Sequence, residues 1–339
     1  MSEPKAESYP VSMIGRQYPL SIVIPIYNEE RILPALFLEL ERVCGTVLKS
    51  SGPIEIVLVN DGSKDKSWGM IAAQCERGNN YVGLNLSRNF GHQLALSAGL
   101  ETARGEVVVS LDADLQDPPA VILQMLEAHR QGYDVVYATR KERGEEKFSK
   151  RATAAIFYFL IEKLSGTAIP RNTGDFRLLS RRALTELSKL RETHRFLRGL
   201  VPWLGFPQTQ IYYDRADRAA GETHFPFGKM LRFAFDGIAS MSTKPLRLAY
   251  MFSLLLFMVF VGYIFYVLYE HFIRGGELVP GWTSIMAAIT IFGTIQLLLL
   301  GVFGEYLGRI YEQAKHRPLF IVQEIKRGEN ESLSPSLEN

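Results

Sequence analysis

Two long runs without a charged residue occupy the C-terminal third of the chain, at 248–269 and 278–304. A helix needs about 20 apolar residues to cross a hydrocarbon core about 30 Å thick, and both runs are long enough. Two buried core helices of a soluble domain are the alternative, but uncharged runs of this length are rare in such cores. We therefore expect two transmembrane helices, at about 248–270 and 281–304.

The charges that flank these runs predict how the chain lies in the membrane. Lysine and arginine precede the first run and follow the second, at Lys244, Arg247, Arg309, Lys315 and Arg317. Cytoplasmic flanks carry the excess of such residues, so both termini should be cytoplasmic in a multi-pass protein of the cell (inner) membrane. The short connection between the runs is too small for a catalytic domain. The chemistry should therefore lie in about the first 225 residues.

Composition excludes several classes of protein. The chain has 38 Lys and Arg against 36 Asp and Glu, and this net charge of +2 is too small for a typical nucleic-acid binder. Its two cysteines, Cys44 and Cys75, lack metal-ligand spacing, and we interpret them as reduced core thiols. No basic stretch followed by an apolar one begins the chain, so we expect no cleaved signal peptide.

Short apolar runs alternate with helical patterns over the rest of the chain. Strands are expected at 20–26, 54–60, 81–87, 106–112 and 133–139, and helices at 30–49, 91–103 and 118–131. Continuously apolar strands that alternate with helices are typical of a mostly parallel sheet covered on both faces. The sequence therefore predicts an α/β domain.

Polar and acidic residues follow these strands, at the edge of the sheet where ligands bind in such folds. The first four strands lead into PIYNE (25–29), NDGS (60–63), SRN (87–89) and DAD (112–114). The sequence contains neither the glycine-rich pattern of dinucleotide-binding proteins after the first strand nor a P-loop. A dinucleotide oxidoreductase and a P-loop phosphatase or kinase are thus disfavoured.

Asp112 and Asp114 leave the fourth expected strand, followed by Gln116, with no nearby cation in the sequence to balance them. Mg²⁺ and Mn²⁺ prefer oxygen ligands and are often held by one or two carboxylates together with substrate phosphates. We interpret the run as a candidate site for such an ion. The alternative is a set of solvated loop acids, and for Asp117, just before Pro118, we expect the role of a helix N-cap.

Four motifs together resemble those of the family 2 glycosyltransferases of GT-A fold, in order and in spacing: VIPIYNE (23–29), NDGSKD (60–65), SRNFG (87–91) and DADLQ (112–116). Within that family the chain is most similar to the polyprenyl-phosphate branch, which includes bactoprenol glucosyltransferases and dolichyl-phosphate mannose synthases. The likeness continues through AGET (220–223) and both apolar runs.

The resemblance implies a domain organisation as well. We expect a GT-A domain, Rossmann-like with a mostly parallel sheet, followed by amphipathic interfacial helices and a two-helix transmembrane hairpin. The expected parts are an N-terminal tail at 1–18, a cytoplasmic GT-A glycosyltransferase domain at 19–225, an amphipathic juxtamembrane helix at 226–247, two transmembrane helices within 248–307 and a cytoplasmic tail at 308–339.

The resemblance also implies roles for the strand-end residues. Contacts to the nucleotide would come from Pro25, Tyr27, Asn28, Glu29, Asp61, Arg88 and Asp112. Asp61 would accept a hydrogen bond from a uracil-like base, whereas Arg88 would either approach the nucleotide or pair with loop acids. Asp114 and Gln116, with Asp112 beside them, would hold an Mg²⁺ or Mn²⁺ ion that bridges the diphosphate.

The segment NTGDFR (172–177) would form the donor–acceptor junction, with Asp175 facing the sugar and Arg177 the phosphates. A guanidinium fork matches phosphate oxygens bidentately and keeps its charge at every physiological pH. A surface Asp–Arg pair in a β-turn is the alternative. The candidate catalytic residues are therefore Asp112, Asp114, Asp175 and Arg177.

Basic residues beside apolar stretches suggest where a lipid phosphate would bind. Arg151 precedes an aromatic and aliphatic stretch at 154–160, which suits a membrane surface. Apolar residues recur with helical period at 227–241, and Lys229 falls opposite them. We favour an interfacial helix over one that packs on the catalytic domain. By resemblance, Lys229 would contact the acceptor phosphate, and His224 would share that role.

The expected activity is transfer of a sugar from a nucleotide diphosphate to undecaprenyl or another polyprenyl phosphate, with metal dependence and inversion at the anomeric carbon. Glucose from UDP-glucose is the first expectation, with mannose, galactose or aminoarabinose as alternatives, and the product would serve cell-envelope or lipopolysaccharide modification. A processive synthase is disfavoured because Q-x-x-R-W is absent. A non-catalytic membrane adaptor or lipid-transport subunit is the second alternative. We also expect a homo-oligomer, with a tetramer among the candidate states.

Overall fold

The computed structural model describes residues 19–47, 52–78, 80–141, 170, 173–214, 244–273 and 281–328. These residues fall into two compact units. The sheet unit holds the described residues up to 214 together with 318–328, and the helical unit holds 244–273 and 281–317. Residues at the end of the chain thus belong to the same unit as those near its beginning.

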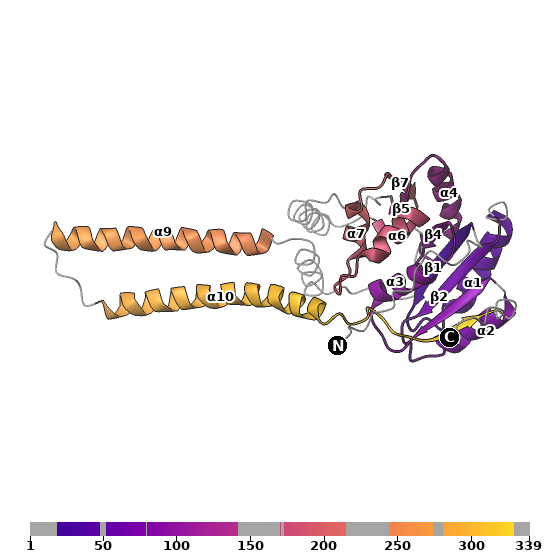
Figure 1. The fold of residues 1–339 in the computed structure, drawn as a ribbon, viewed down its shortest axis with the longest axis horizontal. Helices are drawn as coiled ribbons and strands as arrows, with labels where there is room; N and C mark the ends of the chain where they lie inside the picture. The colour runs from indigo at the N-terminus through magenta and orange to yellow at the C-terminus, as the bar shows by residue number, and fades with distance from the viewer. Residues whose placement is uncertain are drawn as a thin grey trace, which may run out of the picture. The chain divides into compact units, whose positions relative to one another are not determined.

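One eight-stranded sheet organises the sheet unit, in the order β7-β5-β6-β4-β1-β2-β3-β8. Figure 1 labels β7, β5, β4, β1 and β2 of this sheet. The strands are β1 (Leu20–Ile26), β2 (Ile54–Asn60), β3 (Tyr81–Leu86), β4 (Val107–Ser110), β5 (Val135–Arg140), β6 (Thr173–Ser180), β7 (Gln208–Tyr213) and β8 (Val322–Arg327). The five strands expected from apolar runs are all present, with small differences at their ends.

The direction of the strands is more mixed than expected. Strands β1 to β4 form a parallel centre, in which β1 pairs with both β2 and β4, and β2 pairs with β3. Strand β6 runs antiparallel between β4 and β5, and β8 runs antiparallel along β3. The sheet is therefore a mixed α/β sheet with a parallel core, since β6 and β8, which the sequence analysis did not predict, introduce the antiparallel pairs.

Helices cover both faces of this sheet because side chains alternate along each strand. In β1, Leu20, Ile22, Ile24 and Ile26 join one core cluster, whereas Val23 joins the other. The first face is covered by α1 (Leu33–Arg42), α2 (Ser67–Arg77) and α4 (Ile122–Arg130), and the second by α3 (His92–Thr102), α6 (Arg181–Lys189) and α7 (Leu197–Trp203). Figure 1 shows α3, α6 and α7 together on one side of the strands.

Two of the expected helices are shorter than predicted. The helix expected at 30–49 begins at Leu33 as α1 and ends in a π-helical turn, Val43–Val47. The helix expected at 118–131 begins with a short 3-10 turn, Pro119–Val121, before α4. Residues between β4 and α4 are thereby left for a loop, which contains the acidic run.

The helical unit consists of α9 (Lys244–Phe272) and α10 (Trp282–Ala314), with Phe260 of α9 against Phe292 of α10 at a centroid distance of 5.4 Å. Among the described residues, one segment, Ile291–Ala314, is long and apolar enough to span a membrane, and Tyr250–Tyr263 is a shorter apolar stretch. The expected two-helix transmembrane hairpin is therefore not confirmed. Both helices also extend beyond their expected ends.

Candidate functional site

A cavity of about 450 Å³ opens at the carboxyl ends of the four parallel strands. It is lined by Pro25, Ile26, Tyr27, Glu29, Asp61, Asn89, Gly91, His92, Ala95, Asp112, Ala113 and Asp114. Six residues that we expected at the donor end lie together here: Pro25, Tyr27, Glu29, Asp61, Asp112 and Asp114. The parallel register brings these six residues together from three separate segments, which lie at or just after the ends of β1, β2 and β4, as expected for ligand sites in α/β sheets.

The loops after β1 and β2 hold each other in place. The backbone N–H of Asn28 donates to Ser63 Oγ at 2.9 Å, and Asn28 Oδ1 accepts from the Lys64 N–H at 2.9 Å. The Glu29 N–H donates to Ser67 Oγ at 3.0 Å. Asn28 has φ of 55°, a left-handed conformation that few residues other than glycine adopt. Asn28 thus fixes the loop and is absent from the cavity lining.

Gly62 is required where the β2 loop passes the β3 loop. Its φ is +63°, and a Cβ at this position would lie 2.4 Å from the backbone carbon of Arg88 and 2.5 Å from the nitrogen of Asn89. Only glycine permits both the dihedral angle and this close approach. The glycine of the NDGS segment therefore brings Asn89 and its neighbours to the cavity.

The acidic run forms a tight turn after β4. Leu115 has φ of 57°, which is unusual for a bulky side chain, and the Gln116 N–H donates to Asp114 Oδ1 at 3.1 Å. Within the described residues, Asp112 Oδ1 and Gln116 Oε1 are buried without a hydrogen-bond partner. Such oxygens fit a hard cation, which takes oxygen ligands. Gln116 does not line the cavity.

No group of three or more Asp, Glu, His or Cys side chains that could hold a metal occurs in the described ranges. A divalent ion at the acidic run would therefore depend on ligands from its substrate as well. Mg²⁺ sites that combine one or two carboxylates with substrate phosphates have this character. The donor set fits such a site.

Burial raises the pKa of three carboxyl groups in the cavity. For Glu29, burial and the charge of Asp114 raise the pKa, and for Asp112, burial is the largest cause. Burial also raises the pKa of Asp61, although backbone N–H groups of Phe90 and Gly91 donate to its two oxygens at 2.7 and 3.0 Å. Acids crowded together with raised pKa values favour a cation or proton among them.

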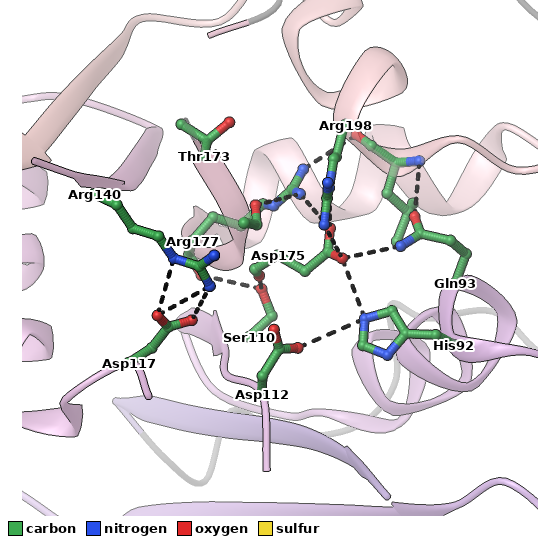
Figure 2. A network of polar contacts seen from close by, with 12 residues as sticks. His92, Gln93, Ser110, Asp112, Asp117, Arg140, Thr173, Asp175, Arg177 and Arg198 are labelled. Atoms are coloured by element: carbon green, nitrogen blue, oxygen red, sulfur yellow. Dashed lines mark hydrogen bonds and ion pairs between the residues drawn. The ribbon is translucent and has the colours of Figure 1, made fainter. Parts of the chain in front are cut away.

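Asp175 lies at the centre of a second network, beside the cavity (Figure 2). Its Oδ1 accepts from Arg177 at 2.7 Å, and Arg198 donates to both oxygens, at 3.2 and 3.1 Å. His92 Nε2 lies 3.1 Å from Asp175 Oδ2 and 3.6 Å from Asp112 Oδ1. The imidazole of His92, which also lines the cavity, therefore connects the acidic run to Asp175.

The charges around Asp175 determine its ionisation. Burial alone would raise its pKa, but the hydrogen bond to His92 and the charges of Arg177 and Arg198 hold that pKa well below its ordinary value. Burial lowers the pKa of His92, but its contacts with Asp175 and Asp112 outweigh burial and raise it. Asp175 is therefore a permanent anion at physiological pH.

Arg177 is buried rather than presented to a ligand. Its side chain is 3% exposed, and Nη1 donates to Leu197 O at 3.1 Å while Nη2 donates to Gly174 O at 3.2 Å. Both Asp175 and Arg177 lie on β6, so the β-turn alternative is wrong. The sequence analysis did not predict β6 because charged residues interrupt its apolar pattern.

Asp117 does not have the expected role of a helix N-cap. Its carboxylate receives Arg140 Nη2 at 3.1 Å on each oxygen, and the hydroxyl of Tyr213 also donates to it. The 3-10 turn that follows, Pro119–Val121, has Pro118 at its N-cap position and no side-chain cap. The prediction failed because a buried carboxylate needs a charge partner, and β5 and β7 supply one from distant sequence.

The remaining expected site residues either do not line the cavity or lie outside the described residues. The Arg88 guanidinium lies 4.0 Å from the centroid of the Phe90 ring, and its Nη1 donates to Asn89 O at 3.0 Å. Arg88 does not line the cavity. The acceptor candidates Arg151, His224 and Lys229 lie outside the described residues.

Two residues of the site, His92 and Arg198, were not predicted from the sequence. His92 directly follows the SRNFG motif, so its position at the start of α3 was a usable signal. Arg198 lies in a segment, 191–198, with several arginines. Nothing in that segment distinguishes the arginine that reaches Asp175, because the contact joins residues 23 apart in sequence.

Comparison with known proteins agrees with this combination of fold and site. The model of the family described as "Glycosyl transferase family 2" matches residues 21–188, which span β1 to nearly the end of α6. This match, together with the relatives below, makes the protein a glycosyltransferase with a mixed α/β, GT-A-like sheet.

The relatives cover nearly the whole chain. The "Uncharacterized glycosyltransferase YkcC" of Bacillus subtilis is 43% identical over 320 residues, which are 94% of this chain and 98% of the relative. The "Prophage bactoprenol glucosyl transferase homolog" of Escherichia coli is 37% identical over 308 residues, 91% of this chain and 99% of the relative. The chain belongs to glycosyl transferase family 2.

A solved structure, glucosyl-3-phosphoglycerate synthase from Mycobacterium tuberculosis in complex with Mn²⁺, UDP and glucosyl-3-phosphoglycerate, has a TM-score of 0.44 and 18% identity to this chain. The likeness covers 66% of this chain and 78% of that protein.

Proposed function

We propose that this glycosyltransferase moves a sugar, with glucose from UDP-glucose as the first candidate, onto the phosphate of a polyprenyl phosphate. The observation that carries the proposal is the convergence of Asp112 and Asp114 with the ends of β1 and β2 in one cavity. Relatives named as bactoprenol glucosyl transferases, 37% identical over at least 90% of this chain, support the lipid acceptor.

The donor nucleotide would lie in the cavity with its base toward β1 and β2. Tyr27 is 42% exposed and lines the cavity, so its ring can pack against a planar base. Each carboxylate oxygen of Asp61 accepts one backbone N–H, and a carboxylate oxygen has two acceptor positions. Asp61 can therefore receive a donor from the base without losing its contacts to the β3 loop.

The diphosphate would lie at the acidic run, where Mg²⁺ or Mn²⁺ would be held by Asp114 and Gln116 with Asp112. Without a cation, these carboxylates would repel the diphosphate. When bound, the ion would act as a Lewis acid that stabilises the charge on the leaving nucleotide diphosphate. The buried oxygens of Asp112 and Gln116 that lack a hydrogen-bond partner within the described residues support this assignment.

The chemistry needs positioning more than proton transfer. A phosphate monoester is already an anion at neutral pH, so its oxygen can attack the anomeric carbon without a strong base. The chain's own residues would orient the two substrates and exclude water from the reacting carbon. A single in-line displacement of this kind inverts the anomeric configuration, and retention in the product would rule it out.

The helical unit would hold the enzyme at the membrane surface where its lipid acceptor lies. Apolar side chains of α9 and α10 are widely exposed, among them Phe257 at 57%, Leu297 at 71% and Leu298 at 64%. Such surfaces are expected where lipid surrounds a helix. We propose a cytoplasmic site on the inner membrane, with α9 and α10 as a two-helix anchor. The homo-oligomer stays a prediction.

A direct assay tests the proposal. Membranes that contain the protein are incubated with undecaprenyl phosphate and, in separate reactions, with UDP-glucose, UDP-galactose, GDP-mannose or UDP-aminoarabinose, and lipid products are identified by mass spectrometry. We expect a hexosyl-phosphate lipid from one donor. Formation of no lipid-linked sugar from any donor would contradict the function and favour the adaptor alternative.

Asp114→Asn is the matched variant. It should abolish transfer, by about 10²-fold or more, because it removes a charged ligand from the proposed metal site. Asp214→Asn is its control, since the Asp214 side chain is 80% exposed and pairs only with exposed Lys141 among the contacts of the described chain. Transfer by Asp114→Asn at the rate of Asp214→Asn would reject the metal role.

A further inference from the structure

Two arginines contact Asp175, but they differ in what they can reach. Arg177 is 3% exposed and both of its Nη atoms donate to protein oxygens, whereas the Arg198 side chain is 33% exposed. A phosphate can contact Arg177 only after the packing around β6 changes. Arg198 reaches the same carboxylate from α7 and still has part of its surface open to solvent.

Arg198 is held in a fixed orientation by contacts to its guanidinium group and to the neighbouring backbone. Its guanidinium contacts Asp175 through Nε at 3.2 Å and Nη2 at 3.1 Å, a paired geometry that fixes the plane of the group. The backbone beside it is fixed too, since the Leu197 N–H donates to Gln93 Oε1 at 3.2 Å. Gln93 Nε2 in turn donates to Asp175 Oδ2 at 3.1 Å. The arginine is therefore pre-organised, which lowers the entropic cost of binding a ligand.

Two guanidinium groups, Arg177 and Arg198, contact the single carboxylate of Asp175, so cationic side chains outnumber the carboxylate in this contact. The donor cavity has the opposite character, with Glu29, Asp61, Asp112 and Asp114 in its lining. His92 lies between the two regions, in contact with both Asp112 and Asp175.

We propose that Arg198, oriented by Asp175, binds the phosphate of the acceptor lipid. This inference rests on the proposed function and specifies its acceptor site. It replaces Arg177, which the sequence analysis assigned to the phosphates, with a partly exposed arginine of α7. Arg177 instead keeps Asp175 charged and in place.

The acceptor phosphate fits Arg198 better than the donor diphosphate does. The residues that line the donor cavity come from the ends of β1 to β4 and the start of α3, whereas Arg198 comes from α7. A diphosphate whose metal ion is held at Asp112 and Asp114 has its counter-charge already. A lipid monophosphate that arrives without a metal needs a fixed cation, and a guanidinium fork supplies one.

The test uses full-length enzyme in detergent or membranes and compares Arg198→Gln and Arg198→Lys with wild type. We expect Arg198→Gln to raise the apparent KM for undecaprenyl phosphate about 10- to 100-fold, the loss typical of a charged hydrogen bond. The KM for the nucleotide sugar should stay within about twofold. Arg198→Lys should recover part of the loss, because it restores the charge without the fork.

Arg191→Gln is the matched control. Arg191 is 57% exposed and pairs with Glu101 at 3.0 Å. The Arg191→Gln variant therefore loses an ion pair that does not involve Asp175. Binding of UDP in the absence of lipid is measured for each variant, and thermal unfolding reports whether each one is folded. Should Arg198→Gln not fold, Arg198→Lys carries the same comparison.

Three results would overturn the assignment: an unchanged acceptor KM, a rise confined to the nucleotide-sugar KM, or equal changes in both KM values. The second would assign Arg198 to the donor diphosphate, and the third would make it a structural partner of Asp175 alone. Failure of the proposed function is distinguishable, because wild type itself would then form no sugar-phosphate lipid.

Discussion

Replacing Asp175 with asparagine should destabilise the sheet unit strongly. Asp175 and Arg177 are 4% and 3% exposed at the side chain and form an ion pair at 2.7 Å. Removing one partner of a buried pair leaves an unpaired charge and costs about 3–5 kcal/mol. Arg198 adds less because it is partly exposed. Taking about 3 kcal/mol, and about 2–4 °C per kcal/mol for a unit of this size, we expect Tm to fall by about 6–12 °C.

Differential scanning fluorimetry of the detergent-solubilised protein measures this shift. Asp134→Asn is the control, since Asp134 is equally buried but its partner Arg182 is 65% exposed and can turn into solvent. Its loss of Tm should be clearly smaller. Equal losses in the two variants would refute the reasoning that burial of the remaining arginine sets the cost. The double variant Asp175→Asn with Arg177→Met should recover part of the loss.

The depressed pKa of Asp175 predicts how the stability contributed by the Asp175–Arg177 pair depends on pH. A carboxyl whose folded-state pKa is lowered contributes stability above its unfolded pKa, about 3.9, and loses it as pH falls through the folded value. The Tm difference between wild type and Asp175→Asn should therefore shrink as pH falls below about 4. It should also decrease as pH rises above about 6.5, because Asp175 raises the pKa of His92 and the contact with the charged imidazole is lost when His92 is deprotonated. A difference that grows as pH falls below about 4 would contradict the assignment of charge to Asp175.

Three further predictions concern the parts around this network. Arg140→Gln should lower the free energy of unfolding by about 3–5 kcal/mol in a denaturation experiment, because Asp117 is 0% exposed, while the nucleotide-sugar KM stays unchanged. Gly62→Ala should destabilise by more than about 1 kcal/mol and weaken UDP binding, whereas Gly132→Ala, with φ of +103° and no atom within 4 Å, should show the dihedral cost alone. Chelation with EDTA should abolish transfer, and added Mg²⁺ or Mn²⁺ should restore it, because the proposed ion would neutralise the diphosphate beside Asp112 and Asp114.

The parallel core of the fold was predictable because its strands are mostly apolar. Strands β1 and β2 are buried at every residue and appear in the sequence as continuous runs. Strand β8 was not predictable in this way. Its exposure alternates along VQEIKR, and its partner β3 lies more than 230 residues earlier, so only pairing in three dimensions defines it as a strand. Edge strands with charged residues have little signal of their own.

The donor end of the site was predictable for a related reason. Each of its residues directly follows a predictable strand, and the carboxyl ends of parallel strands share one edge of the sheet. Asp175 and Arg177 were identified as a pair, but their burial was not, since it depends on the position of β6 between β4 and β5. Contacts such as Arg198 with Asp175 and Arg140 with Asp117 join separate elements, so local sequence patterns do not predict them.

The ionisation of the site agrees with a nucleophile that arrives as an anion. Asp175 is held well below its ordinary pKa, so it stays charged and has little tendency to accept a proton from an attacking group. It also has its two oxygens occupied by Arg177, Arg198 and His92, together with Gln93. An alcohol acceptor would need a base with a pKa nearer the working pH. A phosphate acceptor needs only a fixed cation and a bound donor. Arg198 would provide the cation and the acidic cavity would bind the donor, on either side of His92.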